Sequence, residues 1–273
     1  MDDVLSAGPR NALPRIGLRL GFAALVAGLV MAYGAVPAAA QGEYTGPLFT
    51  PPENQNISGV WWIEEYSAGI EPVGGGDLPF TPEGLQMYEE NMAVLRDGSR
   101  TDEARRICVP DGIPRILGNP YPFEIGQTHN QVTFVYELNH VIRALRLDAV
   151  MPNDEELEIF PAYSGYSVAR WEGDTLIVTT AGFHWDTFID ATGIPHSPQL
   201  RTEERYRRLD ADTLEAVVTV TDPEMFTQPW QARFTYELHP DVRIQDYSCG
   251  DGMHRDISHI PGVTEARQAR QQQ

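Results

Sequence analysis

A single hairpin between residues 166 and 181 constrains the fold of this chain more than any other stretch. β-branched and aromatic residues dominate Tyr166–Trp171 and Thr175–Ala181, and Gly173-Asp174 between them suits a two-residue type II′ turn. Counting outward from the turn places Tyr166 and Arg170 on one face of the hairpin. Both faces carry apolar side chains, so we expect both to be covered by other parts of the fold.

Further segments with strand-like alternation surround this hairpin. They cover residues 57–63, 123–128, 132–138, 141–147, 201–208, 213–221, 230–238 and 243–249. One helix is predicted, with Thr81 as its N-cap and Pro82 as its first residue. An antiparallel meander of this length tends to close, because closure removes exposed edges. We therefore predict an all-β, lipocalin-like closed barrel of about eight to ten strands with one peripheral helix, or alternatively a two-sheet β-sandwich.

The two central residues of a predicted turn, Asn139-His140, determine the surroundings of one arginine. A two-residue turn would pair Leu138 with Val141 and Tyr136 with Arg143. Arg143 would then stand among apolar neighbours. A charge in that position requires a carboxylate or an anionic ligand.

The first forty residues have the pattern of a secretory signal. Three arginines precede the apolar run Leu20–Ala35, and Ala38-Ala39-Ala40 forms a small-residue cleavage site. The run is short and interrupted, so a membrane anchor is the less favoured interpretation, and no membrane span is expected after cleavage. We expect a periplasmic or secreted bacterial protein with an extended arm at 41–56, one barrel domain at 57–260 and a disordered tail at 261–273.

Composition excludes several classes of function. The formal net charge is −19, so nucleic acid is a poor partner. The chain contains no lysine, which excludes Schiff-base chemistry and the Walker A phosphate loop. Neither a Rossmann glycine fingerprint nor a recognised metal-binding spacing occurs, and we predict no organic cofactor and no metal. Cys108 and Cys249 are the only cysteines, and an exported protein favours a disulfide between them over two free thiols.

The segment after the hairpin, residues 182–200, is predicted to form the rim of a pocket. It carries two histidines, two aspartates and three aromatic residues. General acid/base chemistry needs a group that exchanges protons near neutral pH beside a charged partner. The candidate catalytic residues are His196, His184, Asp190, Glu204, Arg143 and Tyr166. The candidate ligand-binding residues are His140, Tyr136, Phe134, Arg170, Phe183, Trp185, Asp186 and Trp61.

Short motifs are spread over most of the chain after residue 107. They include Arg170-Trp-Glu-Gly-Asp-Thr-Leu176, His196-Ser197, Glu204-Arg-Tyr206, Asp222-Pro223, Pro229-Trp230 and Tyr247-x-Cys249. In these motifs the chain resembles a large family of secreted bacterial proteins with lipocalin-like features and no established activity. It departs from the family pattern at Tyr166, Thr179 and His184, where relatives carry His, Asp and Asn. A site typical of the family is therefore either lost here or rebuilt with a phenol and an imidazole.

Two functions fit this sequence. The first is a cofactor-independent acid/base enzyme, an isomerase, lyase or hydrolase, acting on an apolar or aromatic small molecule held in a barrel cavity. The second is a lipocalin-like carrier that binds such a molecule without changing it. Catalysis predicts a deeply placed histidine with a carboxylate neighbour and a shifted pKa, whereas carriage predicts an apolar cavity with histidines at the surface. The sequence does not indicate an oligomeric state.

Overall fold

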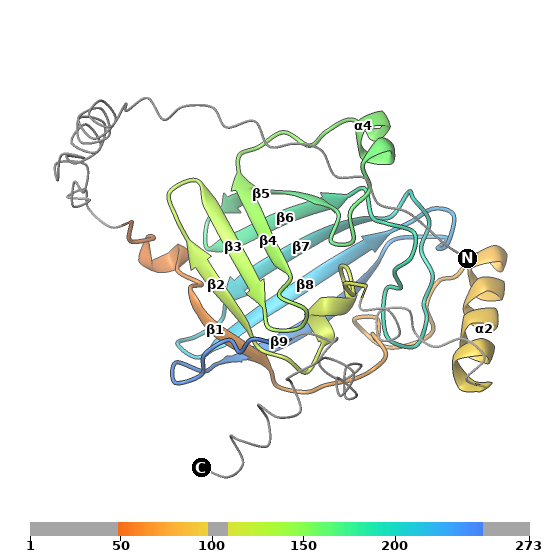
Figure 1. Cartoon of the computed structure of the whole chain (residues 1–273), viewed down its shortest axis with the longest axis horizontal. Coiled ribbons are helices and arrows are strands. Elements are labelled where there is room, and N and C mark those ends of the chain that lie inside the picture. The colour runs from red at the N-terminus through yellow and green to blue at the C-terminus, as the bar shows by residue number, and fades with distance from the viewer. Residues whose placement is uncertain (1–48, 98–108, 248–273) are drawn as a thin grey trace, which may run out of the picture. The chain divides into compact units, whose positions relative to one another are not determined.

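The structure is a computed structural model that describes residues 49–97 and 109–247. In these residues nine strands close into one barrel, and each strand lies beside its neighbours in the sequence (Figure 1). The strands are β1 Gly59–Ile63, β2 Phe123–Gln127, β3 Gln131–Tyr136, β4 Ile142–Leu147, β5 Tyr166–Glu172, β6 Thr175–Ala181, β7 Arg201–Arg208, β8 Thr213–Thr221 and β9 Trp230–Leu238. Because β1 pairs with both β2 and β9, the sheet is closed, and the barrel is confirmed over the sandwich.

The central hairpin has the predicted register. Tyr166 pairs with Ala181 and Trp171 with Leu176. Gly173 has a φ of 64°, as the first central residue of a type II′ turn requires, and an added Cβ there would meet nothing within 4 Å. Both strands also pair outward, β5 with β4 and β6 with β7.

One strand junction differs from an antiparallel meander. β4 and β5 run parallel and share only the pairs Arg146 with Val168 and Leu147 with Ala169. A parallel neighbour needs a crossover connection, and residues 148–165 supply it. The acidic stretch within this crossover forms the short helix α4, Asp154–Ile159, which begins with a capping box between Asn153 and Glu156.

The predicted turn at Asn139-His140 is longer than two residues. Phe134 pairs with Arg143 and Val135 with Ile142, so the register predicted from a two-residue turn is wrong by two positions. A shift of two preserves the side of the sheet that each side chain faces. Arg143 therefore points into the barrel as predicted, and it is buried.

Five segments between the strands meet at one end of the barrel, which we call the loop end, and the crossover 148–165 runs to it from the opposite end. They are residues 64–81, the segment 109–122 with the 3₁₀ helix η3 (Arg115–Gly118), and the connections 137–141, 182–200 and 222–229. The opposite end is closed by short turns, beside the 3₁₀ helix η2 (Glu53–Gln55). Because most neighbouring strands are antiparallel, successive connections lie at alternate ends of the barrel, with the tight turns at one end and most of the long connections at the other. The loop end is therefore the end at which a binding site can be built.

The predicted helix is α2, Pro82–Asp97, which lies to one side of the barrel (Figure 1). Thr81 is its N-cap, since the Thr81 hydroxyl accepts a hydrogen bond from the Gly84 N–H at 3.0 Å. Asn91 donates to the Gly193 carbonyl at 2.9 Å, which ties α2 to the connection 182–200. Among the described residues, no helix has the length and apolar character needed to cross a membrane.

Several sequence predictions lie outside the described residues. They concern the signal segment 1–40, residues 41–48 of the arm, the tail 261–273, and both Cys108 and Cys249. The strand predicted at 243–249 is not formed over its described part, residues 243–247, where Tyr247 makes one isolated bridge with Leu138.

Candidate functional site

The interior of the barrel is filled by aromatic rings. Trp61 and Phe134 are 0% exposed and Tyr136 is 2% exposed. The Phe134 ring lies 5.0 Å from that of Tyr206, centre to centre. Phe123 lies 4.9 Å from Tyr236 in an edge-to-face arrangement. We expected the first three residues to line a ligand cavity, whereas the structure places them in the packed core.

A buried ion pair crosses this interior. The two terminal nitrogens of Arg143 donate to the two carboxylate oxygens of Glu204, each at 2.8 Å. Tyr206 donates to the same carboxylate at 2.6 Å and Thr180 at 3.2 Å. Arg143 also donates to the Ser167 hydroxyl at 3.1 Å. Glu204 is thus the carboxylate that the sequence required for Arg143.

The surroundings of the pair shift the pKa values of Arg143 and of two nearby tyrosines. Burial alone lowers the pKa of Arg143, but the charge of Glu204 and its hydrogen bonds raise that pKa well above the ordinary value. Burial, with the added charge of Glu204, raises the pKa of Tyr206 well above its usual range. Burial also raises the pKa of Tyr136 to about 12, although the nearby Arg143 charge acts in the other direction.

Arg143, Glu204 and Tyr136 are closed off from solvent. The Tyr136 hydroxyl lies beside Arg143 and Tyr206 but makes no hydrogen bond of regular geometry. Arg143 and Glu204 side chains are 2% and 0% exposed. A ligand at the surface does not reach groups buried to this degree, so this network stabilises the barrel and does not form an accessible site.

His196 lies beneath the surface of the loop end. Its Nδ1 faces the Ser197 carbonyl at 3.1 Å and its Nε2 faces the Thr187 hydroxyl at 2.7 Å. A carbonyl only accepts, so Nδ1 carries the proton when the ring is neutral, and Nε2 faces the Thr187 hydroxyl, which also donates to the His184 carbonyl at 3.0 Å. Burial, as the largest effect, lowers the pKa of His196 and favours this neutral form. Ser197 is fixed in turn by Asp222, which accepts from its N–H and hydroxyl at 2.6 and 2.8 Å.

Asp190, another predicted catalytic residue, holds the connection 182–200 in shape. Its carboxylate accepts from the N–H groups of Thr192, Gly193 and Ile194 at 2.9, 3.1 and 3.2 Å. It also accepts from the N–H of Ile70 at 3.0 Å, which joins two connections of the loop end. Because its carboxylate accepts from four backbone N–H groups, Asp190 has a structural role in holding the two connections together.

His184 and its neighbours form an aromatic stack near the surface. The His184 ring lies 4.1 Å from that of Trp185 and 4.6 Å from that of Tyr163. Its Nδ1 accepts from the Asp186 N–H at 3.3 Å and lies 3.6 Å from the Asp186 carboxylate. Trp185 itself is 66% exposed. One face of its indole rests on His184 and the rest is open.

Three predicted residues lie apart from these groups. Tyr166 and Arg170 are on the outer face of the barrel, where Arg170 pairs with Glu172 at 2.7 Å. Their position follows from the even spacing between them, because alternate residues of a strand share a face, and the opposite face packs inward. His140 is half exposed and pairs with Asp246 at 2.9 Å. The predicted convergence of these residues with His184 and Arg143 in one cavity is therefore wrong.

A pocket of about 870 Å³ opens beside Trp185, between α4 and the connections 182–200 and 222–229. We call it the loop-end pocket. It is lined by Asp154, Leu157, Glu158, Pro161, Gly182, Phe183, Trp185, Pro198, Gln199, Arg201, Thr221, Pro223 and Glu224. The segment 182–200, predicted to form the rim of a pocket, contributes Gly182, Phe183, Trp185, Pro198 and Gln199 to this lining. His196 lies behind this lining, with its ring 6.2 Å from that of Phe183.

Neither α4 nor Arg201 was predicted from the sequence to contribute to a pocket. The relevant signal was the capping box, an Asn followed three residues later by a Glu, which marks a helix start at Asn153. A helix there turns Leu157 toward Gly182, where an added Cβ would lie 2.9 Å from the leucine side chain. Arg201 was placed correctly in a strand, but its proximity to Asp154 depends on the crossover.

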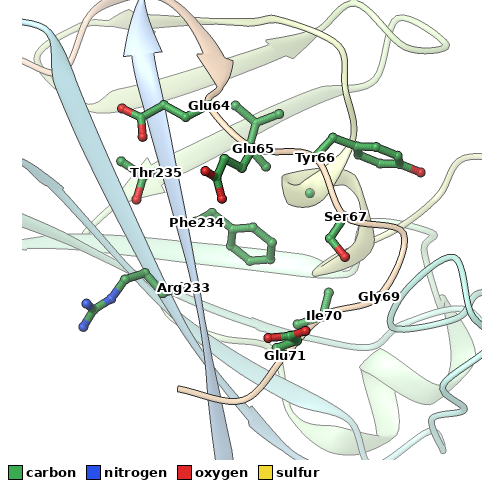
Figure 2. Close-up of a pocket in the computed structure, with 12 residues that line it drawn as sticks. Glu64, Glu65, Tyr66, Ser67, Gly69, Ile70, Glu71, Arg233, Phe234 and Thr235 are labelled. Carbon is green, nitrogen blue, oxygen red and sulfur yellow. The ribbon is translucent and has the colours of Figure 1, made fainter. Parts of the chain in front are cut away.

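A second pocket of about 430 Å³ lies at another part of the loop end, and none of the predicted residues lines it. We call it the arch pocket, because residues 64–71 arch over Phe234. Figure 2 shows Glu65 and Glu71 near the Phe234 ring, whereas Glu64 and Arg233 point away from it. Arg233 is paired with Glu215 at 3.3 Å. Most of the charged residues that line this pocket are therefore acidic, as are most of those that line the loop-end pocket.

Comparisons with models of protein families and with curated proteins found no match to this chain. Within residues 49–97 and 109–247, no group of three or more His, Cys, Asp or Glu residues is arranged to hold a metal ion.

Proposed function

We propose that this protein binds an apolar or aromatic small molecule in the loop-end pocket and carries it unchanged, in the periplasm or outside the cell. The observation that supports the proposal is a concave site of about 870 Å³ with Leu157, Phe183 and Trp185 on its walls. Pockets of about 300–1,000 Å³ accommodate molecules of drug size. The open indole of Trp185 supplies a flat surface for stacking an aromatic ring.

Two features favour carriage over turnover. His196, the histidine with a lowered pKa, does not line the pocket, and both of its ring nitrogens already have partners. The Arg143–Glu204 pair is enclosed in the core, so it cannot stabilise charge on a molecule at the loop end. The residues that line the pocket include carboxylates but no histidine, the side chain best suited to exchange protons near neutral pH.

The test compares two exposed tryptophans. The wild-type chain, Trp185→Ala and Trp62→Ala are screened by titration calorimetry against a panel of small aromatic and aliphatic molecules. Trp62 is 36% exposed, lies near His239 and does not line the pocket, so its replacement is the matched control. We expect Trp185→Ala to weaken binding roughly tenfold, on the scale of one lost aromatic contact, and Trp62→Ala to leave it unchanged. Equal binding by all three proteins would contradict the proposal.

A second candidate function is an acid/base enzyme, and the Thr187–His196 pair favours it. The Thr187 hydroxyl lies 2.7 Å from Nε2 of His196, which the Ser197 carbonyl orients through Nδ1. If this hydroxyl turned from the His184 carbonyl, to which it donates at 3.0 Å, toward Nε2, the pair would have the arrangement of an activated nucleophile. The pair lies under Phe183, so a substrate would reach it only if that ring moved. This function predicts product formation from a bound molecule by the wild-type chain and none by His196→Gln. Release of the unchanged molecule by both would favour the carrier.

A further inference from the structure

The lining of the loop-end pocket carries more negative than positive side chains. It contains three carboxylates, Asp154, Glu158 and Glu224, and one cation, Arg201. Arg201 donates to the carboxylate of Asp154, and this ion pair neutralises the one positive group. An anionic ligand would have to displace Asp154 to use Arg201, and would still face the two remaining carboxylates.

Those two carboxylates carry charge that no ion pair balances within the described part of the chain. Glu224 accepts a hydrogen bond from the neutral amide of Gln199, which leaves its charge in place. Glu158 has no partner there, and it projects from α4 one residue after the buried Leu157. The pocket thus combines apolar walls with negative charge, in a chain whose net charge is −19.

The indole of Trp185 adds a second and independent preference. Its ring is stacked on His184, its side chain is 66% exposed, and it lines the pocket. The face of an indole carries partial negative charge, and it attracts ammonium and guanidinium groups more strongly than other aromatic rings do. An exposed indole beside uncompensated carboxylates is the composition of a site for organic cations.

We propose that the ligand of the loop-end pocket is an organic cation, an amine or quaternary ammonium group attached to an apolar or aromatic body. This inference rests on the proposed binding function and narrows its ligand. The apolar body contacts Leu157 and Phe183, and the cationic group lies between the open face of Trp185 and the carboxylates of Glu158 and Glu224. The field of the whole chain raises the rate of encounter with such a cation.

The experiment uses two probes of the same shape and different charge, 2-naphthylmethylammonium and 2-naphthylmethanol. Each is titrated into the whole protein by calorimetry at low ionic strength and again at high salt. We expect the ammonium probe to bind roughly tenfold more tightly at low ionic strength, and the difference to shrink as salt screens the carboxylates. In the double variant Glu158→Gln/Glu224→Gln, the two probes are expected to bind equally well.

The matched control is Glu65→Gln/Glu71→Gln in the arch pocket, which removes the same charge from another part of the loop end. It should retain the preference for the ammonium probe. Loss of that preference in the arch-pocket variant would overturn the inference, because the field of the chain or the arch pocket would then account for it. Tighter or equal binding of the neutral probe by the wild-type chain would overturn the inference and leave the binding function standing. Binding of neither probe would overturn both.

Discussion

The stability of the barrel is expected to depend strongly on the buried Arg143–Glu204 pair. Replacing Glu204 with Leu leaves the Arg143 charge in a core where its side chain is 2% exposed, and removes the acceptor of two 2.8 Å hydrogen bonds. Leaving one member of a buried pair without its partner costs about 3–5 kcal/mol. For a domain of this size, that corresponds to a fall in the melting temperature of about 6–20 °C.

A double variant separates the ion pair from the loss of volume. Arg143→Met/Glu204→Leu removes both charges, and the remaining cost is about 1–2 kcal/mol, mainly from the Tyr206 hydroxyl, which loses its 2.6 Å acceptor. The double variant should therefore be more stable than either single variant. Urea unfolding, followed by tryptophan fluorescence at neutral pH, measures the free energy of unfolding of four proteins. They are the wild-type chain, the single variants Arg143→Met and Glu204→Leu, and the double variant.

An exposed pair of the same chemistry serves as the control. Arg170 and Glu172 lie 2.7 Å apart with side chains 48% and 46% exposed. Pairs of this kind contribute less than about 1 kcal/mol, so Glu172→Leu should be nearly neutral. The reasoning is refuted if Glu204→Leu costs no more than Glu172→Leu, or if the double variant loses as much stability as the two single variants together.

Three further predictions concern the connections around the barrel. Gly165→Ala should cost about 1–3 kcal/mol more than Gly173→Ala, since both residues have positive φ but an added Cβ at Gly165 would lie 2.6 Å from a Thr180 methyl group, and at Gly173 it meets nothing within 4 Å. Equal melting temperatures would contradict this. Burial lowers the folded-state pKa of His196 below the unfolded value, so its contribution to stability is present above about pH 6.5 and is lost as the pH falls toward the folded pKa. The free energy of unfolding of His196→Gln, measured against pH, should therefore fall less steeply below about pH 6.5 than that of the wild-type chain. Asp190→Ala should cost about 2–4 kcal/mol by leaving several N–H groups without an acceptor, and faster amide exchange at Gly193 and Ile194 would report it.

The fold was largely predictable because local patterns and turn chemistry agreed with the global topology. Alternation located β7, β8 and β9 at their observed boundaries, and Gly173-Asp174 fixed the central hairpin. The burial of Arg143 was predicted in spite of a wrong turn length, because an even shift in register leaves each side chain on the same face. The requirement for a carboxylate partner then followed from the cost of an unpaired charge.

The candidate site was predicted less well. A sequence shows which residues are near one another along a strand, but it does not show which strands lie opposite each other or how far side chains fill a barrel. Tyr166 and Arg170 were grouped with the pocket because they are close to it in sequence, yet they occupy the outer face. The loop-end pocket depends on α4, which is positioned by the parallel junction of β4 and β5. No local sequence pattern specifies whether β4 and β5 pair in the parallel or the antiparallel direction.

The lengths of the ladders divide the barrel into two ribbons. From β5 to β9, each junction pairs seven or eight residues, whereas the junction between β4 and β5 pairs two. Arg143 belongs to the smaller ribbon, β1 to β4, and Glu204 belongs to the larger one. Their ion pair therefore links the two ribbons across the β4–β5 junction, which has the fewest paired residues. When the ion pair is removed, we expect β4 and β5 to separate before the other strands do.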